Sequence, residues 1–120
     1  MSDTSPPTPV VVIDKTPNSI IAHVNVKLLD DQELKLLSQL IDQSAGAAAS
    51  GVSLVVIDLA RVQILTSIGL GALVQISNKC RARGQSLKIA AAQPAIRKVF
   101  AITRLDRILD LTDSVEAATQ

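Results

Sequence analysis

The stretch "SLVVIDLARVQILTSIGLGAL", residues 53–73, decides how this chain is expected to fold. Its first seven residues are mostly apolar and do not alternate with polar ones, which predicts a central strand covered on both faces. From Leu70 onward, apolar residues recur at the spacing of a helix. Thr66 and Ser67 therefore lie at a junction between strand and helix, where hydroxyls either cap the helix or form a functional site.

Similar patterns extend on both sides of this stretch. Strands are expected at residues 10–14, 20–26, 53–59, 86–92 and 106–111. Helices are expected to begin at Asp30 or Asp31, at the Thr66–Ser67 junction, at Pro94 and near Asp113. Glu33 and Glu116 follow two of these starts at the spacing of a capping box. The order predicts a single α/β domain, with a mixed, mainly parallel sheet of about four to five strands and about four helices packed on it.

Length and composition limit what else the chain can contain. Its 120 residues fit one domain of ordinary size. Residues 1–9 include three prolines and predict a flexible tail, so the folded domain is expected at residues 10–120. Hydrophobic residues make up 48% of the chain, but Phe100 is the sole aromatic. This predicts an aliphatic core and no platform on which nucleobases could stack.

Cysteine content and hydropathy favour a cytoplasmic protein. Cys80 is the only cysteine, so an internal disulfide is impossible and a reducing compartment is the simpler expectation. The first ten residues do not resemble a secretory signal. Residues 62–78 are uncharged, but polar side chains interrupt them and their length is at the short limit for a bilayer span. We therefore expect no membrane insertion.

The groups that catalysis requires are hard to assemble from this sequence. His23 is the only histidine, and no second imidazole or thiol lies at ligand spacing, so we expect no metal and interpret it as a strand residue near the surface or satisfied in the core. Asp30 and Asp31 favour a helix start over an acid and base pair. The Gly69–Gly71 segment is too short for a phosphate loop. We expect a protein that is not an enzyme and has no cofactor.

The second half of the chain is basic. Nine basic residues and one acid lie between Arg61 and Arg107. A solvated face is the commonest explanation for such a distribution, and an acidic protein partner is the next. We do not expect a nucleic acid partner, because aromatic residues are missing.

From Leu54 to Phe100 the chain resembles the STAS family, the domain of bacterial anti-sigma factor antagonists. The segments "GLGAL" and "QPAIRKVF" match the family pattern, and "ITRLDRILDL" near the end extends the likeness to about Ala118. The resemblance implies a small α/β domain that binds an anti-sigma factor with serine protein kinase activity and so frees the sigma factor. In regulated members, the kinase phosphorylates a serine of the motif and ends the interaction.

Alignment on Gly69 puts Ile68 at the position of the family's phosphorylated serine. Since Ile68 has no hydroxyl, the usual switch cannot operate there. Ser67 and Thr66 are the remaining candidate phosphoacceptors, with Thr66 the weaker of the two. A capping function is the commoner use of such hydroxyls and is favoured for Ser67.

The resemblance predicts a partner-switching protein that regulates transcription by binding. Its docking surface is expected to comprise Asp30, Leu65, Thr66, Ser67, Ile68, Gly69 and Leu70. One alternative is an adaptor or scaffold subunit of a sensor or membrane transport complex that is not phosphorylated. Another is a nucleotide- or anion-binding domain that uses the Thr66–Gly71 loop. An exposed first strand could also pair with a second copy as a homodimer.

Overall fold

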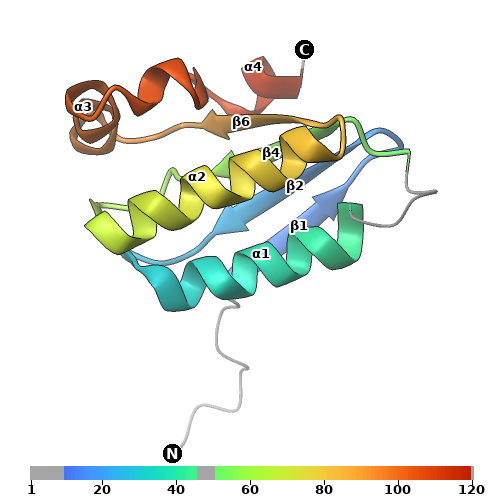
Figure 1. The fold of residues 1–120 in the computed structure, drawn as a ribbon, viewed down its shortest axis with the longest axis horizontal. Coiled ribbons are helices and arrows are strands. Elements are labelled where there is room, and N and C mark those ends of the chain that lie inside the picture. Colours follow the sequence, from blue (N-terminus) through green and yellow to red (C-terminus); the bar gives the residue numbers. More distant parts are fainter. Residues whose placement is uncertain (1–9, 46–50, 120) are drawn as a thin grey trace, which may run out of the picture.

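The computed structural model describes residues 10–45 and 51–119, which form one five-stranded sheet with helices on it (Figure 1). The strand order is β1-β2-β4-β6-β7, and every neighbouring pair is parallel except β1 and β2. The strands of this sheet are β1 (Val11–Lys15), β2 (Ser19–Val24), β4 (Leu54–Asp58), β6 (Ser86–Ala90) and β7 (Asp110–Thr112). The helices are α1 (Asp31–Ala45), α2 (Ser67–Ala82), α3 (Pro94–Ile102) and α4 (Val115–Thr119). The predicted α/β class, helix number and mixed sheet are therefore confirmed.

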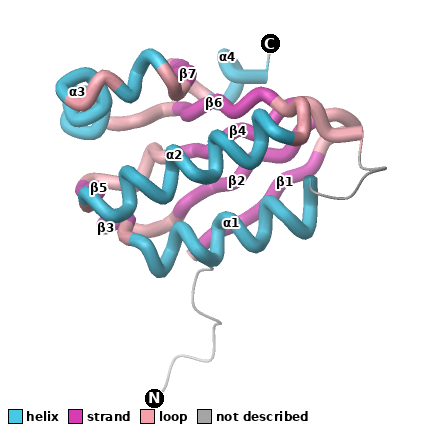
Figure 2. The backbone as a smooth tube through the Cα atoms, in the orientation of Figure 1, coloured by secondary structure: helices cyan, strands magenta, loops and turns pink. Residues whose placement is uncertain are grey.

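The two faces of the sheet are covered unequally. Helices α1 and α2 lie side by side across one face, where they bury most of the core (Figures 1 and 2). On the opposite face, Ala118 of the short helix α4 packs on Ile21, Val56 and Ala90. Because α4 has only five residues, this second face keeps polar side chains toward its β1 edge, among them His23 and Asp58.

Local sequence accounts for the central helices. In α1, Leu34, Leu37 and Ile41 are buried, as the helical spacing predicts. In α2, Leu73, Ile76 and Cys80 are buried in the same core. Burial raises the pKa of the Cys80 thiol, so this cysteine contributes packing and not a reactive thiolate. Gly84 ends the helix region with a φ of 75°, a left-handed conformation that favours glycine.

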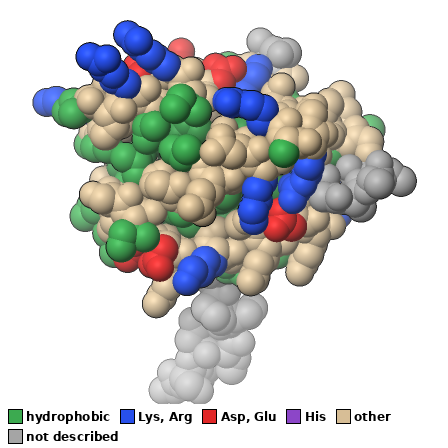
Figure 3. Space-filling model, viewed as in Figure 1, with side chains coloured by type: hydrophobic (Ala, Val, Ile, Leu, Met, Phe, Trp, Pro, Cys, Tyr) green, Lys and Arg blue, Asp and Glu red, His purple; other side chains and the backbone are tan. Residues whose placement is uncertain are grey.

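Helix α3 supplies the one aromatic side chain of the core. Phe100 is fully buried together with Ile96, and Pro94 occupies the first turn of the helix, where its missing N–H costs nothing. Ile102, at the other end of the helix, is 72% exposed. The helix is therefore amphipathic, and its outer side contributes apolar and basic residues to the surface. Hydrophobic and basic side chains gather at this end of the molecule in the space-filling view (Figure 3).

A second, two-stranded sheet was not expected from the sequence. Strands β3 (Leu28–Leu29) and β5 (Ile64–Leu65) pair in parallel beside the main sheet (Figure 2). Each has only two residues, so neither leaves a pattern in the sequence that could be recognised. Their pairing aligns the segment before α1 with the segment before α2.

Several element ends differ from those that the sequence predicted. The prediction of a strand at residues 106–111 is wrong for its first half. Leu105–Arg107 form a 3-10 helix, and β7 begins only at Asp110. Ser114, not Asp113, caps α4: its hydroxyl accepts from the Ala117 N–H at 3.0 Å. Among the described residues Glu33 makes no side-chain hydrogen bond, so no capping box forms at α1. The expected tail at residues 1–9 and the centre of the alanine-rich connector, residues 46–50, lie outside the described residues.

Candidate functional site

The starts of α1 and α2 meet at one end of the sheet because backbone bonds tie their preceding segments together. The carbonyl of Lys27 accepts from Gln63 N at 2.8 Å and from Ile64 N at 2.9 Å. Two residues further on, the Thr66 N–H donates to the Leu29 carbonyl at 3.2 Å. The segments before α1 and α2 therefore run side by side in register until each helix begins.

The side chain of Thr66 joins the two helix starts. Its Oγ1 accepts from the Gly69 N–H at 3.0 Å, which makes Thr66 the N-cap of α2. The same hydroxyl donates to Oδ1 of Asp30 at 2.6 Å. Asp30 Oδ1 also accepts from the Asp31 N–H at 2.8 Å, at the first residue of α1. One hydroxyl and one carboxylate thus satisfy a backbone donor at each helix start and bond to each other.

These hydrogen bonds fix the charge state of Asp30. The bond from Thr66, followed by that from the Asp31 N–H, lowers the pKa of the Asp30 carboxyl below its ordinary value. Asp30 is therefore an anion at neutral pH. A carboxylate in contact with the capping hydroxyl disfavours a second anion there, which argues against the Thr66–Gly71 loop as an anion pocket.

Gly69 is required where α2 passes the end of β3. A Cβ at this position would lie 2.8 Å from the Leu29 carbonyl oxygen, 3.1 Å from Thr66 Oγ1 and 3.2 Å from a methyl of Leu65. Gly71, two residues further on and on the outside of the helix, has no neighbouring atom within 4 Å of such a Cβ. The first glycine of "GLG" therefore serves close packing, whereas the second does not.

The surface around the starts of α1 and α2 exposes more apolar residues than the sequence indicated. Ile68 is 67% exposed and Ser67 is exposed beside it, whereas Leu65, Thr66 and Leu70 are partly buried and Gly69 is buried. Ile64 and Leu28, 56% and 44% exposed, extend the apolar area onto the β3–β5 ladder. We call the set formed by Leu28, Asp30 and Ile64–Leu70 the α1–α2 surface. Leu28 and Ile64 were missed because their exposure depends on the two short strands.

The structure also decides which hydroxyl caps the helix. The sequence favoured a capping function for Ser67, but the cap is Thr66, and Ser67 is the first helical residue. Within the described part of the chain, the Ser67 hydroxyl makes no hydrogen bond. Ser67 is thus the exposed hydroxyl of the pair, and Thr66 is the engaged one.

A family model for the STAS domain matches residues 11–118, nearly the whole chain. The chain belongs to the STAS domain family. This match agrees with the resemblance that the sequence motifs indicated. The α1–α2 surface includes the start of one of these motifs, "GLGAL".

Several solved structures, among them anti-sigma factor antagonists, have the same fold. The Thermotoga maritima protein TM1081 superposes with a TM-score of 0.77 at 20% identity, covering 91% of each chain. An anti-sigma factor antagonist from Mycobacterium paratuberculosis gives a TM-score of 0.73 at 24% identity, covering 91% of this chain and 89% of that one. The Bacillus cell fate determinant SpoIIAA in its phosphorylated form gives 0.66 at 17%, covering 89% and 95%. Within the residues described for this STAS domain, no helix is long and apolar enough to cross a membrane.

The single histidine of this STAS domain lies on the opposite face of the sheet, at the end of β2. Its Nδ1 lies 2.7 Å from Asp58 Oδ2, and its Nε2 lies 2.9 Å from Asp14 Oδ2. Burial lowers the pKa of His23, but the hydrogen bonds to Asp58 and then Asp14 outweigh it, so the pKa is raised above 6.5. The interpretation of His23 as a satisfied strand residue is confirmed.

We predict opposite effects for two glycine substitutions in α2. Gly69→Ala should destabilise the STAS domain by about 1–3 kcal/mol, because the new methyl group meets the Leu29 carbonyl. Gly71→Ala is the matched control and should stabilise by up to about 1 kcal/mol, since alanine is the better residue in an exposed helix position. Urea unfolding of both variants measures the difference. Equal effects would contradict the close approach of α2 to β3.

The His23 cluster predicts a pH dependence of stability. A raised pKa means that the folded state binds the proton more tightly than the unfolded state. The contribution of His23 should be fully present below pH 6.5, the unfolded value, and should disappear as pH rises through the higher folded pKa. Urea unfolding of the parent and His23→Gln from about pH 5.5 to 8.5 should show their stability difference shrinking with pH. A difference that grows with pH would contradict the cluster.

Proposed function

We propose that this STAS domain is a partner-switching protein of the anti-sigma factor antagonist kind, which binds an anti-sigma factor or related serine protein kinase through the α1–α2 surface. In this function it acts by docking in the cytoplasm, without catalysis. The similarity to anti-sigma factor antagonists supports the kind of partner, and the geometry of the α1–α2 surface supports the place.

The observation that carries the proposal is the exposure of Ile68 beside the Thr66–Asp30 bond. Ile68 is 67% exposed at the first turn of α2, so most of its side chain contributes no free energy of burial to the isolated protein. Together with Ile64 and Leu28 it forms an apolar area next to the charged Asp30. Interfaces commonly combine an apolar centre with polar groups at its rim. The Thr66–Asp30 bond fixes the positions of these groups before any partner arrives.

Regulation by phosphorylation requires a hydroxyl other than the usual one, because Ile68 occupies that position. Ser67 is exposed and its hydroxyl is available, whereas that of Thr66 is engaged by Asp30 and Gly69. We therefore propose Ser67 as the phosphoacceptor. A phosphate there would add about −1.5 to −2 charges to the α1–α2 surface, beside the Asp30 carboxylate. This charge would oppose docking of an apolar or acidic partner.

The competing proposal is an adaptor or scaffold that is never phosphorylated. Ile68 is the specific observation in its favour, because it leaves the surface permanently apolar at the family's switch position. The adaptor would use the same docking surface within a sensor or membrane transport complex and would not be phosphorylated. The two experiments below therefore test docking to a kinase and control by phosphorylation separately.

Docking predicts a large difference between two matched isoleucine variants. Ile68→Asp should weaken binding of a purified anti-sigma factor kinase by about tenfold or more, because a charge replaces an apolar contact. Ile102→Asp is the control, since Ile102 is similarly exposed, at 72%, but lies on α3. Isothermal titration calorimetry gives both affinities. Equal losses, or none at Ile68, would contradict docking through the α1–α2 surface.

Control by phosphorylation predicts a difference between two substitutions of Ser67. Ser67→Asp should weaken binding of the same kinase, whereas Ser67→Ala should preserve it, because only the first adds negative charge to the surface. Incubation with the kinase and ATP, followed by intact mass and fragmentation, should place a phosphate on Ser67 in the parent chain. Equal affinities of the two variants and an unmodified Ser67 would favour the adaptor.

A further inference from the structure

A polar hollow lies where β2 and β4 end and α3 begins. It has a volume of about 330 Å³, and its lining comes from three segments that are far apart in the sequence. The lining residues are Asn25, Val26, Lys27, Arg61, Gln63 and Gln93. Ligands of open α/β sheets commonly bind beyond the carboxyl ends of parallel strands, which is where this hollow lies.

The lining of the hollow is rich in hydrogen-bond donors and in positive charge. Lys27 and Arg61 bring two cations, and three side-chain amides supply further donors. Of the described residues that line it, none is an aspartate or a glutamate. Neither Lys27 nor Arg61 forms an ion pair with another described residue. Their charges are therefore not neutralised by the protein itself.

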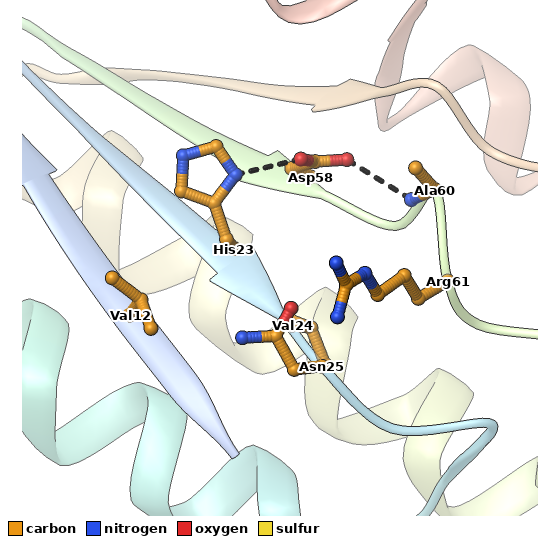
Figure 4. A pocket seen from close by; sticks show the side chains of 7 residues that line it. All are labelled: Val12, His23, Val24, Asn25, Asp58, Ala60 and Arg61. Carbon is orange, nitrogen blue, oxygen red and sulfur yellow. Dashed lines mark hydrogen bonds and ion pairs between the residues drawn. The ribbon is translucent and has the colours of Figure 1, made fainter. Parts of the chain in front are cut away.

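Arg61 is shared with a neighbouring hollow of about 290 Å³, which Figure 4 shows from close by. The guanidinium of Arg61 points inward there, toward Asn25 (Figure 4). Asp58 lines this second hollow, but its two oxygens already accept hydrogen bonds, from His23 and from the Ala60 N–H at 3.0 Å. Within the described residues, no ion pair joins Arg61 to Asp58, and Asp58 pairs with His23 instead, so the Arg61 guanidinium can bind a ligand.

The framework around the first hollow is held by hydrogen bonds. Gln93 donates through Nε2 to the Ala60 carbonyl at 2.9 Å, which ties the start of α3 to the turn after β4. The Lys27 carbonyl accepts from Gln63 N, which ties the other two segments together. The positive end of α3 begins at the residue after Gln93. The backbone segments that carry Lys27, Arg61 and Gln93 are therefore held together before a ligand binds.

We propose that this hollow binds a small ligand that carries a phosphate or carboxylate group, with Lys27 and Arg61 contacting the anion. A guanidinium matches the paired oxygens of either group, and the Gln63 amide can donate to them as well. The sole aromatic, Phe100, is buried in the core, so the hollow has no platform for stacking a nucleobase. A small metabolite anion therefore fits better than a nucleotide.

This site does not depend on the proposed docking function. Its residues lie before β3, before β5 and between β6 and α3, and none belongs to the α1–α2 surface. Ligand binding can thus be measured on the isolated protein, and its failure would leave docking untouched.

Nuclear magnetic resonance titration with inorganic phosphate and with citrate, at constant ionic strength in sodium chloride, tests the site. Saturable shifts should concentrate at the amides of Lys27, Arg61, Gln63 and Gln93. Arg61→Gln should weaken the binding by about tenfold, because it removes a charge-assisted contact. Arg81→Gln, which removes an exposed arginine on α2, is the control and should leave the affinity unchanged.

Binding of phosphate alone would identify a phosphate ligand, and binding of citrate alone a carboxylate ligand. Three outcomes would overturn the site. The first is a linear shift spread over many basic residues, which indicates general screening of charge. The second is equal weakening by Arg61→Gln and Arg81→Gln. The third is a set of shifts confined to residues 66–71, which would place the anion at the start of α2.

Discussion

The hydroxyl of Thr66 accepts from the Gly69 N–H and donates to Asp30, and the arrangement of the α1–α2 surface depends on this pair of bonds. A hydroxyl can make both bonds at once because it is donor and acceptor together. Gly69 must then lack a side chain, since the hydroxyl and the Leu29 carbonyl occupy the space of its Cβ. With Thr66 used in this way, Ser67 and Ile68 are left at the surface.

The unequal covering of the sheet separates two kinds of chemistry. The face under α1 and α2 is aliphatic and closed, and its edge carries the exposed isoleucines of the α1–α2 surface. The opposite face is only partly covered by α4, so charged groups such as His23 and Asp58 can be hydrated or paired there. Docking and anion binding are proposed at neighbouring places. The α1–α2 surface supplies apolar groups from β3 and β5, and the hollow supplies donors from the segments that precede these two strands.

Much of the fold could be predicted from the sequence because its main elements are long and regular. The buried stripe of α1, the covered strand β4 and the glycine after α2 each left a local pattern. The resemblance to the STAS family also located the start of α2. The short strands β3 and β5 could not be predicted, since two-residue strands exist only through their pairing with each other. The exposure of Leu28 and Ile64 could not be predicted either, because it depends on the pairing of these two strands.

The candidate site was only partly predictable for a similar reason. Sequence showed two hydroxyls at a helix start, but only the position of Asp30, 36 residues away in the chain, decides that Thr66 is the engaged one.

The central claim is that a kinase partner covers the α1–α2 surface. Amide hydrogen exchange of this protein with and without a bound anti-sigma factor kinase tests it most directly. New protection is expected only at residues 28–33 and 64–70, whereas protection confined to α3 or α4 would contradict docking through the α1–α2 surface.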